Sequence, residues 1–334
     1  MAKNELSRLI IVAVLICAAI AVLMQHRNNA KEIGSKEYWV SQIQKEGPAR
    51  AYAEFANDVS SFDPSTQHGD AHIFGNALFA TEGLSGISAC DDRFSYGCYH
   101  EFISQALLAD GLSVLPEIDA VCKKAVSAIA CRHGIGHGLL AYFGYGTSDL
   151  KKAVAVCAQI GDESQQGCLG GVFMEYNMRI MTGLNNARPL EAELFAPCNG
   201  YSGAAQQSCM FYQPQWWWTV LPNSGGSDKT GVVTRMISLC EQGPARVACM
   251  EGVGLMVPTS VAYDEARSVA LCTEAAKTTD DETYCITGAA TVFAGISRVS
   301  DASAMCATLT EKQRGFCMQY SEGSINVPFS ELPI

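Results

Sequence analysis

Cysteines recur along this chain in closely spaced couples, and no other feature of the sequence constrains the fold as strongly. One of the 15 cysteines, Cys17, lies inside an apolar N-terminal stretch, and the other fourteen form seven couples. The first members of successive couples lie 32 to 42 residues apart, a period typical of helix-turn-helix repeat proteins. The couples are Cys90 and Cys98, Cys122 and Cys131, Cys157 and Cys168, Cys198 and Cys209, Cys240 and Cys249, Cys272 and Cys285, and Cys306 and Cys317.

The sequence around each couple favours one helix before the first cysteine and a second helix after its mate. Residues 148–156, before Cys157, have a capping residue and apolar side chains at helical spacing, and Gly161 begins a turn. A second apolar helix is expected from Cys168 to Tyr176. In an antiparallel hairpin the end of one helix and the beginning of the next are neighbours, within reach of a disulfide.

Three arrangements of these cysteines are compatible with the repeat. Pairing within couples leaves none of the fourteen over, whereas linking each second cysteine to the next couple leaves Cys90 and Cys317 unmatched. Fully reduced cysteines would instead form a zinc array. The chain has no Cys-x-x-Cys, which excludes a thioredoxin-type motif, a zinc-ribbon knuckle and covalent haem attachment. We favour pairing within couples, which stabilises each hairpin by about 2–4 kcal/mol and indicates an oxidising compartment.

The stretch from Cys157 to Tyr176, with Cys-Leu-Gly-Gly at the start of its second helix, resembles the cysteine-rich Sel1-like repeat proteins, relatives of tetratricopeptide repeats. The resemblance covers roughly residues 85–325. It implies a right-handed α-solenoid of αα-hairpins, each pinned by one disulfide, and it implies no catalytic activity. We therefore expect an all-α fold of about eight helical hairpins, seven pinned by an intra-hairpin disulfide, and one N-terminal transmembrane helix.

One of these hairpins lies upstream of the first couple and has no cysteine. Ala49 to Phe62 has the spacing of an amphipathic helix, and Asp63-Pro64 is a capping residue followed by a first-turn proline. His68 to Thr81 can form the partner helix. Residues 36–47 are expected to add a short N-terminal capping helix.

The N-terminus predicts a membrane segment. Leu9 to Met24 is a run of sixteen residues without a charge, preceded and followed by basic residues. It is either a cleaved signal peptide or an uncleaved signal-anchor, and we favour the anchor because no good cleavage site follows it. The predicted domains are an anchor at 1–31 and one helical-repeat domain at 32–334, with histidine-bearing repeats at 49–147 and further repeats at 148–325.

Composition limits the compartments in which the protein can lie and the classes of partner that it can bind. The chain is 48% hydrophobic and 17% charged, which excludes a disordered protein. Its net charge of −11 argues against nucleic acid as a partner, because such binding needs a basic surface. No Asn-x-Ser/Thr sequence occurs, which favours a bacterial periplasm over an ER lumen. We expect a single-pass inner-membrane protein whose body lies in the periplasm or an equivalent oxidising space.

Five of the six histidines fall in register at the start of three consecutive second helices. His68 and His72 repeat the His-x-x-x-His spacing of His133 and His137, and His100 follows its cysteine by two residues, as His133 does. Side chains four residues apart share one helix face, so we expect these imidazoles to converge on one or two ions. The predicted metal ligands are His68, His72, His100, His133, His137 and Glu101.

Several interpretations of the histidines stay open. An imidazole-rich set suits zinc, iron, copper or nickel, and axial ligation of non-covalent haem by two histidines is a lesser option. Asp70, Glu101 and Glu175 are candidate oxygen ligands or hydrogen-bond acceptors, and a carboxylate can bridge two ions. Gly69, Gly134 and Gly136 would allow close approach. Structural packing and a pH-sensing or acid–base role are the alternatives to a metal site.

The predicted function is binding of a transition metal through the histidine cluster, with or without metal-dependent catalysis. The alternative is a non-enzymatic solenoid scaffold for a protein or peptide in the periplasm. No serine-hydrolase elbow, phosphate loop or His-Glu-x-x-His occurs, so the sequence predicts no reaction and no catalytic residue. At least one ring of Trp216 to Trp218 is expected to be exposed as a contact surface, unless the run fills the core.

Overall fold

The structure, a computed structural model, describes residues 32–125, 127–161, 165–179, 193–221, 230–296 and 298–321. These residues form helices joined by turns, with no strand among them, so the predicted all-α class is confirmed. The predicted anchor, Leu9 to Met24, lies outside them. Within the described part of the chain, no helix combines the length and the apolar character that crossing a bilayer requires.

The upstream unit without cysteines has the predicted helices, α2 (Lys36–Glu46), α3 (Pro48–Asp58) and α4 (Pro64–Glu82). Ser35 and Asp63 cap α2 and α4 by accepting hydrogen bonds from backbone N–H groups of the first turn. Pro64 occupies the first helical position, where a missing N–H costs nothing. This unit positions α4, which carries the first two histidines.

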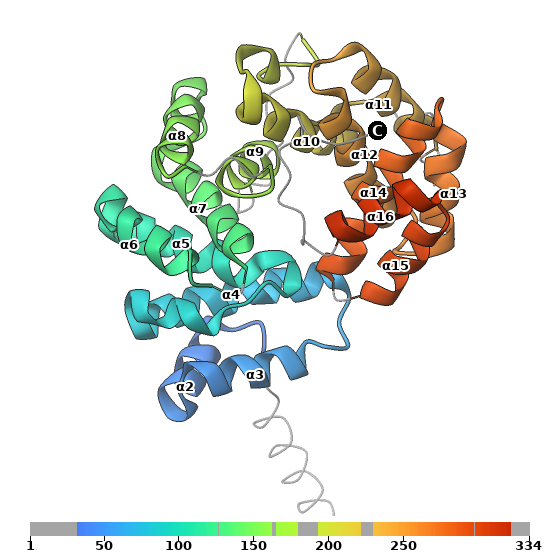
Figure 1. The fold of residues 1–334 in the computed structure, drawn as a ribbon. Coiled ribbons are helices and arrows are strands. Elements are labelled where there is room, and N and C mark those ends of the chain that lie inside the picture. The colour runs from blue at the N-terminus through green and yellow to red at the C-terminus, as the bar shows by residue number, and fades with distance from the viewer. Residues whose placement is uncertain are drawn as a thin grey trace, which may run out of the picture.

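The helices from α4 onward form two rows along an arc (Figure 1). The inner row consists of α4, α5, α7, α9, α10, α12, α14 and α16, and each of these contacts the next. The outer row contains α6, α8, α11, α13 and α15. The bounds are α5 (Gly97–Asp110), α6 (Leu115–Cys122), α7 (Ala128–Phe143), α8 (Thr147–Gln159), α9 (Cys168–Met178), α10 (Gly203–Val220), α11 (Thr230–Gln242), α12 (Arg246–Ser260), α13 (Glu265–Ala275), α14 (Thr279–Gly295), α15 (Val299–Ala307) and α16 (Glu311–Ser321), with 3-10 segments η1 (Gly83–Ala89), η2 (Phe94–Tyr96), η3 (Gly111–Val114) and η4 (Cys198–Gly200).

The last hairpin returns to the middle of the chain. The side-chain amides of Gln165 and Gln166, in the turn before α9, donate hydrogen bonds to the Tyr320 hydroxyl of α16 over 3.2 and 3.3 Å. Tyr320 lies 155 residues from Gln165 in sequence. The C-terminal end of the arc is therefore tied to its middle through its interior.

All seven disulfides form within couples, as predicted, with Cα–Cα distances of 5.2 to 5.6 Å. In each couple the second cysteine lies in an inner helix and its mate lies at or near the end of the segment before that helix. The bonds join Cys90 to Cys98, Cys122 to Cys131, Cys157 to Cys168, Cys198 to Cys209, Cys240 to Cys249, Cys272 to Cys285 and Cys306 to Cys317.

In two hairpins the first cysteine lies in or directly after a 3-10 segment and not in an α-helix. Cys90 directly follows the 3-10 segment η1, and Cys198 lies in η4. Residues 83–89 contain two glycines and two serines, which are poor α-helix formers, and Pro197 precedes the second segment. The partners of these cysteines, Cys98 in α5 and Cys209 in α10, lie in α-helices as predicted.

Glycines allow the inner helices to cross closely at some of the predicted positions. A Cβ on Gly136 of α7 would lie 2.1 Å from the Cys168 carbonyl oxygen of α9, and one on Gly171 would lie 1.9 Å from the His133 oxygen. Only glycine fits such a crossing. A Cβ on Gly69 would meet nothing within 4 Å, because this position is on the exposed side of α4, so no helix approaches closely there.

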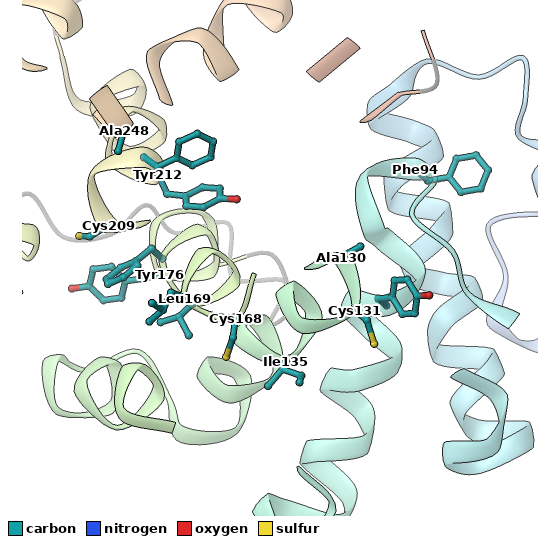
Figure 2. Close-up of a cluster of buried hydrophobic side chains, with 14 of the residues drawn as sticks. Phe94, Ala130, Cys131, Ile135, Cys168, Leu169, Tyr176, Cys209, Tyr212 and Ala248 are labelled. Carbon is teal, nitrogen blue, oxygen red and sulfur yellow. The ribbon is translucent and has the colours of Figure 1, made fainter. Parts of the chain in front are cut away.

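One continuous hydrophobic core runs along the stack, from Trp39 to Cys317. Figure 2 shows part of it, with side chains such as Ile135, Leu169 and Tyr212 contributed by successive inner helices. Trp216 and Trp217 are fully buried and Trp218 is partly buried against this core, so the tryptophan run fills the core.

Candidate metal centre

Three neighbouring inner helices bring the five predicted histidines together. Helix α4 carries His68 and His72, α5 carries His100, and α7 carries His133 and His137. Adjacent rings follow one another with centroids 4.2 to 5.3 Å apart along the series from His68 to His137. We call this set the histidine centre.

The histidine centre contains two groups of three that have suitable geometry for a metal ion. The first is His68, His72 and His100, and the second is His100, His133 and His137. Within each group, one nitrogen from each ring lies within 4.8 Å of the other two. His100 belongs to both groups. It lies on the middle helix of the three, which gives it a neighbour on either side.

Backbone carbonyls fix the orientation of one histidine in each group. Nδ1 of His68 lies 2.8 Å from the Phe94 carbonyl oxygen, and Nδ1 of His133 lies 2.6 Å from the Gln166 carbonyl oxygen. A carbonyl only accepts hydrogen bonds, so each Nδ1 carries the proton and each Nε2 carries the lone pair of its ring. This arrangement of one ring nitrogen anchored and the other free is typical of metal-binding histidines.

A carboxylate does the same for His137. Its Nδ1 lies 2.8 Å from Glu175 Oε2, and both side chains are fully buried. The Tyr145 hydroxyl donates to the other Glu175 oxygen over 2.5 Å. The proton of neutral His137 is therefore on Nδ1, and its buried Nε2 makes no hydrogen bond. Unpartnered buried nitrogens of this kind are rare and call for an explanation.

Glu101, predicted as a ligand, lies outside both groups of three. Its Oε2 is 3.6 Å from Nδ1 of His72, and its Oε1 accepts a hydrogen bond from Gln105. It therefore lies behind His72, as Glu175 lies behind His137. Asp70 is half-exposed and also belongs to neither group.

Burial keeps four of the imidazoles neutral. Desolvation, together with the neighbouring imidazoles, lowers the pKa of His68, His133 and His137 to about 3. The pKa of His100 falls well below its usual value for the same two reasons. Neutral imidazole is the form that binds a metal ion, so none of these four rings has to lose the extra proton of an imidazolium at physiological pH.

In the first group, three ring nitrogens meet around Nε2 of His72. Nε2 of His72 lies 3.1 Å from Nε2 of His68 and 3.4 Å from Nδ1 of His100. Nε2 of His68 is already a lone pair, because the proton of that ring is on Nδ1. A cation between these nitrogens would use all three lone pairs at once.

Tyrosines that sequence reasoning missed line the centre. The rings of Tyr96 and Tyr212 lie 5.7 and 5.9 Å from that of His133. Burial raises the pKa of Tyr96 to about 12 and that of Tyr212 well above its usual value, so both hydroxyls are neutral. Figure 2 shows Tyr212 projecting from α10. Neither residue lies in the histidine register, so its position along the sequence gives no signal.

Comparison of the chain with known protein families, with curated proteins and with solved structures gives no match. Assignment of a function therefore depends on the chemistry of the histidine centre. Five imidazoles and two carboxylates behind them form an arrangement that could hold a transition metal ion.

Proposed function

We propose that this protein binds a transition metal at the histidine centre. The observation that carries the proposal is the orientation of the rings. His68, His133 and His137 each direct Nδ1 to an oxygen acceptor, which puts the lone pair of each ring on Nε2, and the buried Nε2 of His137 has no hydrogen-bond partner. A packing role would not require three tautomers to agree in this way. Hydrogen-bonded core histidines use both nitrogens where they can.

The donor set favours zinc, copper, iron or nickel over calcium or magnesium, because its donors are imidazole nitrogens and its carboxylates are behind them. A bare ion is favoured over haem. Two axial ligands of one haem iron lie on opposite faces of the macrocycle, whereas neighbouring rings here are in direct contact, the closest pair being His100 and His137 at 4.2 Å.

The setting of this site is part of the same proposal. The seven disulfides are typical of a protein that folds in an oxidising compartment. We propose that the apolar run from Leu9 to Met24 anchors the chain in an inner membrane and that the body lies in the periplasm. We also propose that the stack is a right-handed α-solenoid of the Sel1-like kind, which the sequential contacts of the inner helices support.

Titration of the metal-stripped full-length protein tests the metal site. We expect Zn²⁺ and Cu²⁺ to bind in calorimetry, and we expect the paired substitution of His133→Gln and His137→Gln to remove the binding at the second group of three. Ile135→Val is the matched control, because Ile135 is fully buried on the same helix between these histidines but offers no ligand. That variant should bind as the wild type does.

Two results would overturn the proposal. One is a folded wild-type protein that binds neither ion. The other is binding that survives the paired histidine substitution unchanged. A metal-free protein that co-purifies with a defined partner would instead favour a non-enzymatic scaffold that binds a protein or peptide on its solenoid face.

A further inference from the structure

We infer that the histidine centre holds two metal ions and that His100 bridges them, with one ring nitrogen on each ion. This inference rests on the proposed metal site and specifies its nuclearity. It replaces the carboxylate bridge that the sequence suggested, because Glu101 and Glu175 both lie behind histidines at their Nδ1 atoms.

The two groups of three are built in the same way. Each has one histidine whose Nδ1 is held by a backbone carbonyl, His68 in the first and His133 in the second. Each also has one histidine with a carboxylate at Nδ1, His72 in the first and His137 in the second. A single-ion site would need only one such set. Two complete sets, each with its own charge-balancing carboxylate, are the arrangement expected for two ions.

His100 is the exception that joins the two sets. Its Nδ1 lies 3.4 Å from His72 Nε2 in the first group, and its Nε2 is fully buried without a hydrogen-bond partner. It is fully buried between the other four imidazoles. Neither of its nitrogens contacts an oxygen acceptor of the kind that orients its neighbours. Both nitrogens are therefore available, and an imidazole has one lone-pair direction at each of them.

Bridging changes the protonation of His100 but involves no redox step. Neutral imidazole offers one lone pair, which binds the first ion. When the second ion binds, the remaining N–H bond breaks, the nitrogen keeps the electron pair and forms the second metal–nitrogen bond, and the proton leaves to the buffer. The resulting imidazolate carries a negative charge between two cations, which offsets their mutual repulsion in a buried site.

Each ion would then have three protein ligands. Three protein ligands and one remaining position are typical of catalytic rather than structural zinc sites. The remaining position on each ion would accept water or a small substrate. The inference therefore favours a metal-dependent enzyme over a site that only stabilises the fold.

Copper loading of the metal-stripped full-length protein tests the bridge. We expect two Cu²⁺ per chain by elemental analysis, and we expect magnetic coupling through the shared imidazolate. At low temperature, double integration of the EPR signal should account for far less than one spin per copper. His68→Gln and His133→Gln each remove one group and leave His100 in place. Each variant should bind one Cu²⁺ and regain about one spin per copper.

The outcomes separate this inference from the proposed metal site. Two coppers per chain with full spin intensity would overturn the bridge, and one copper per chain would overturn the dinuclear site, while both results leave metal binding intact. No copper bound would overturn both. A His100→Gln variant that folds, as judged by circular dichroism, should lose the coupling completely, and persistent coupling in that variant would also refute the role of His100.

Discussion

Acidification should destabilise the metal-free protein through its buried histidines. The folded-state pKa of His133 and His137 is about 3, well below the value of about 6.5 for an exposed histidine. At pH values between these two limits the unfolded chain binds protons that the folded chain does not. The free energy of unfolding therefore falls as pH falls through about 6.5, and it continues to fall until pH reaches about 3.

The magnitude follows from the two pKa values. Each fully shifted group changes the free energy of unfolding by about 1.4 kcal/mol per pH unit. Between pH 7 and pH 5 the histidine of the unfolded chain goes from mostly neutral to mostly protonated. The free energy of unfolding therefore falls by about 2 kcal/mol per histidine, or by about 4 kcal/mol for His133 and His137 together. Both rings are almost completely buried, so solvent screening reduces this value little.

Urea unfolding of metal-stripped protein at pH 7, 6 and 5 measures this effect. Other groups also titrate in this range, so the relevant quantity is the difference between the wild type and the variant with His133→Gln and His137→Gln. The wild type should lose about 4 kcal/mol more than the variant between pH 7 and pH 5. Parallel pH curves for the two proteins would refute the argument that these imidazoles are buried and neutral.

Three further predictions concern packing, disulfides and topology. Gly136→Ala should lower the free energy of unfolding by at least about 1–3 kcal/mol, because its Cβ would collide with the Cys168 carbonyl. Gly69→Ala should be neutral or stabilising by up to about 1 kcal/mol, because its Cβ would meet nothing. Chemical denaturation of both variants measures this difference. Replacing Cys157 and Cys168 by serine should cost about 2–4 kcal/mol in the same assay, and no loss would contradict a disulfide between them. A reporter enzyme that is active only outside the cytoplasm should be active when fused after residue 334, because the body is expected to be exported. Activity of a cytosolic reporter at the same position would refute the proposed role of Leu9 to Met24.

The periodic features of this fold could be predicted from the sequence. Cysteine spacing predicted all seven disulfides. The shared register of the histidines predicted that five side chains from three neighbouring helices lie close together. Both predictions succeed because a helical repeat brings equivalent positions together, so spacing along the chain becomes position in space. The cap at Asp63 and Pro64 is equally local and was equally predictable.

The surroundings of the site could not be predicted in the same way. The acceptors for His68 and His133 are the backbone carbonyls of Phe94 and Gln166, and backbone atoms in turns have no sequence signal. Glu101 directly follows His100 in sequence. Successive residues on a helix point in different directions, so the Glu101 carboxylate lies 3.6 Å from Nδ1 of His72.

Metal content of the protein as isolated tests the central claim most directly. Full-length protein is expressed in metal-replete medium, purified without chelators and subjected to elemental analysis beside the paired substitution of His133→Gln and His137→Gln and the control Ile135→Val. The histidine centre predicts a stoichiometric transition metal in the wild type and in the control, with the metal of the second group of three lost from the paired variant. A folded wild-type protein with no stoichiometric transition metal would contradict the claim that these histidines form a metal site.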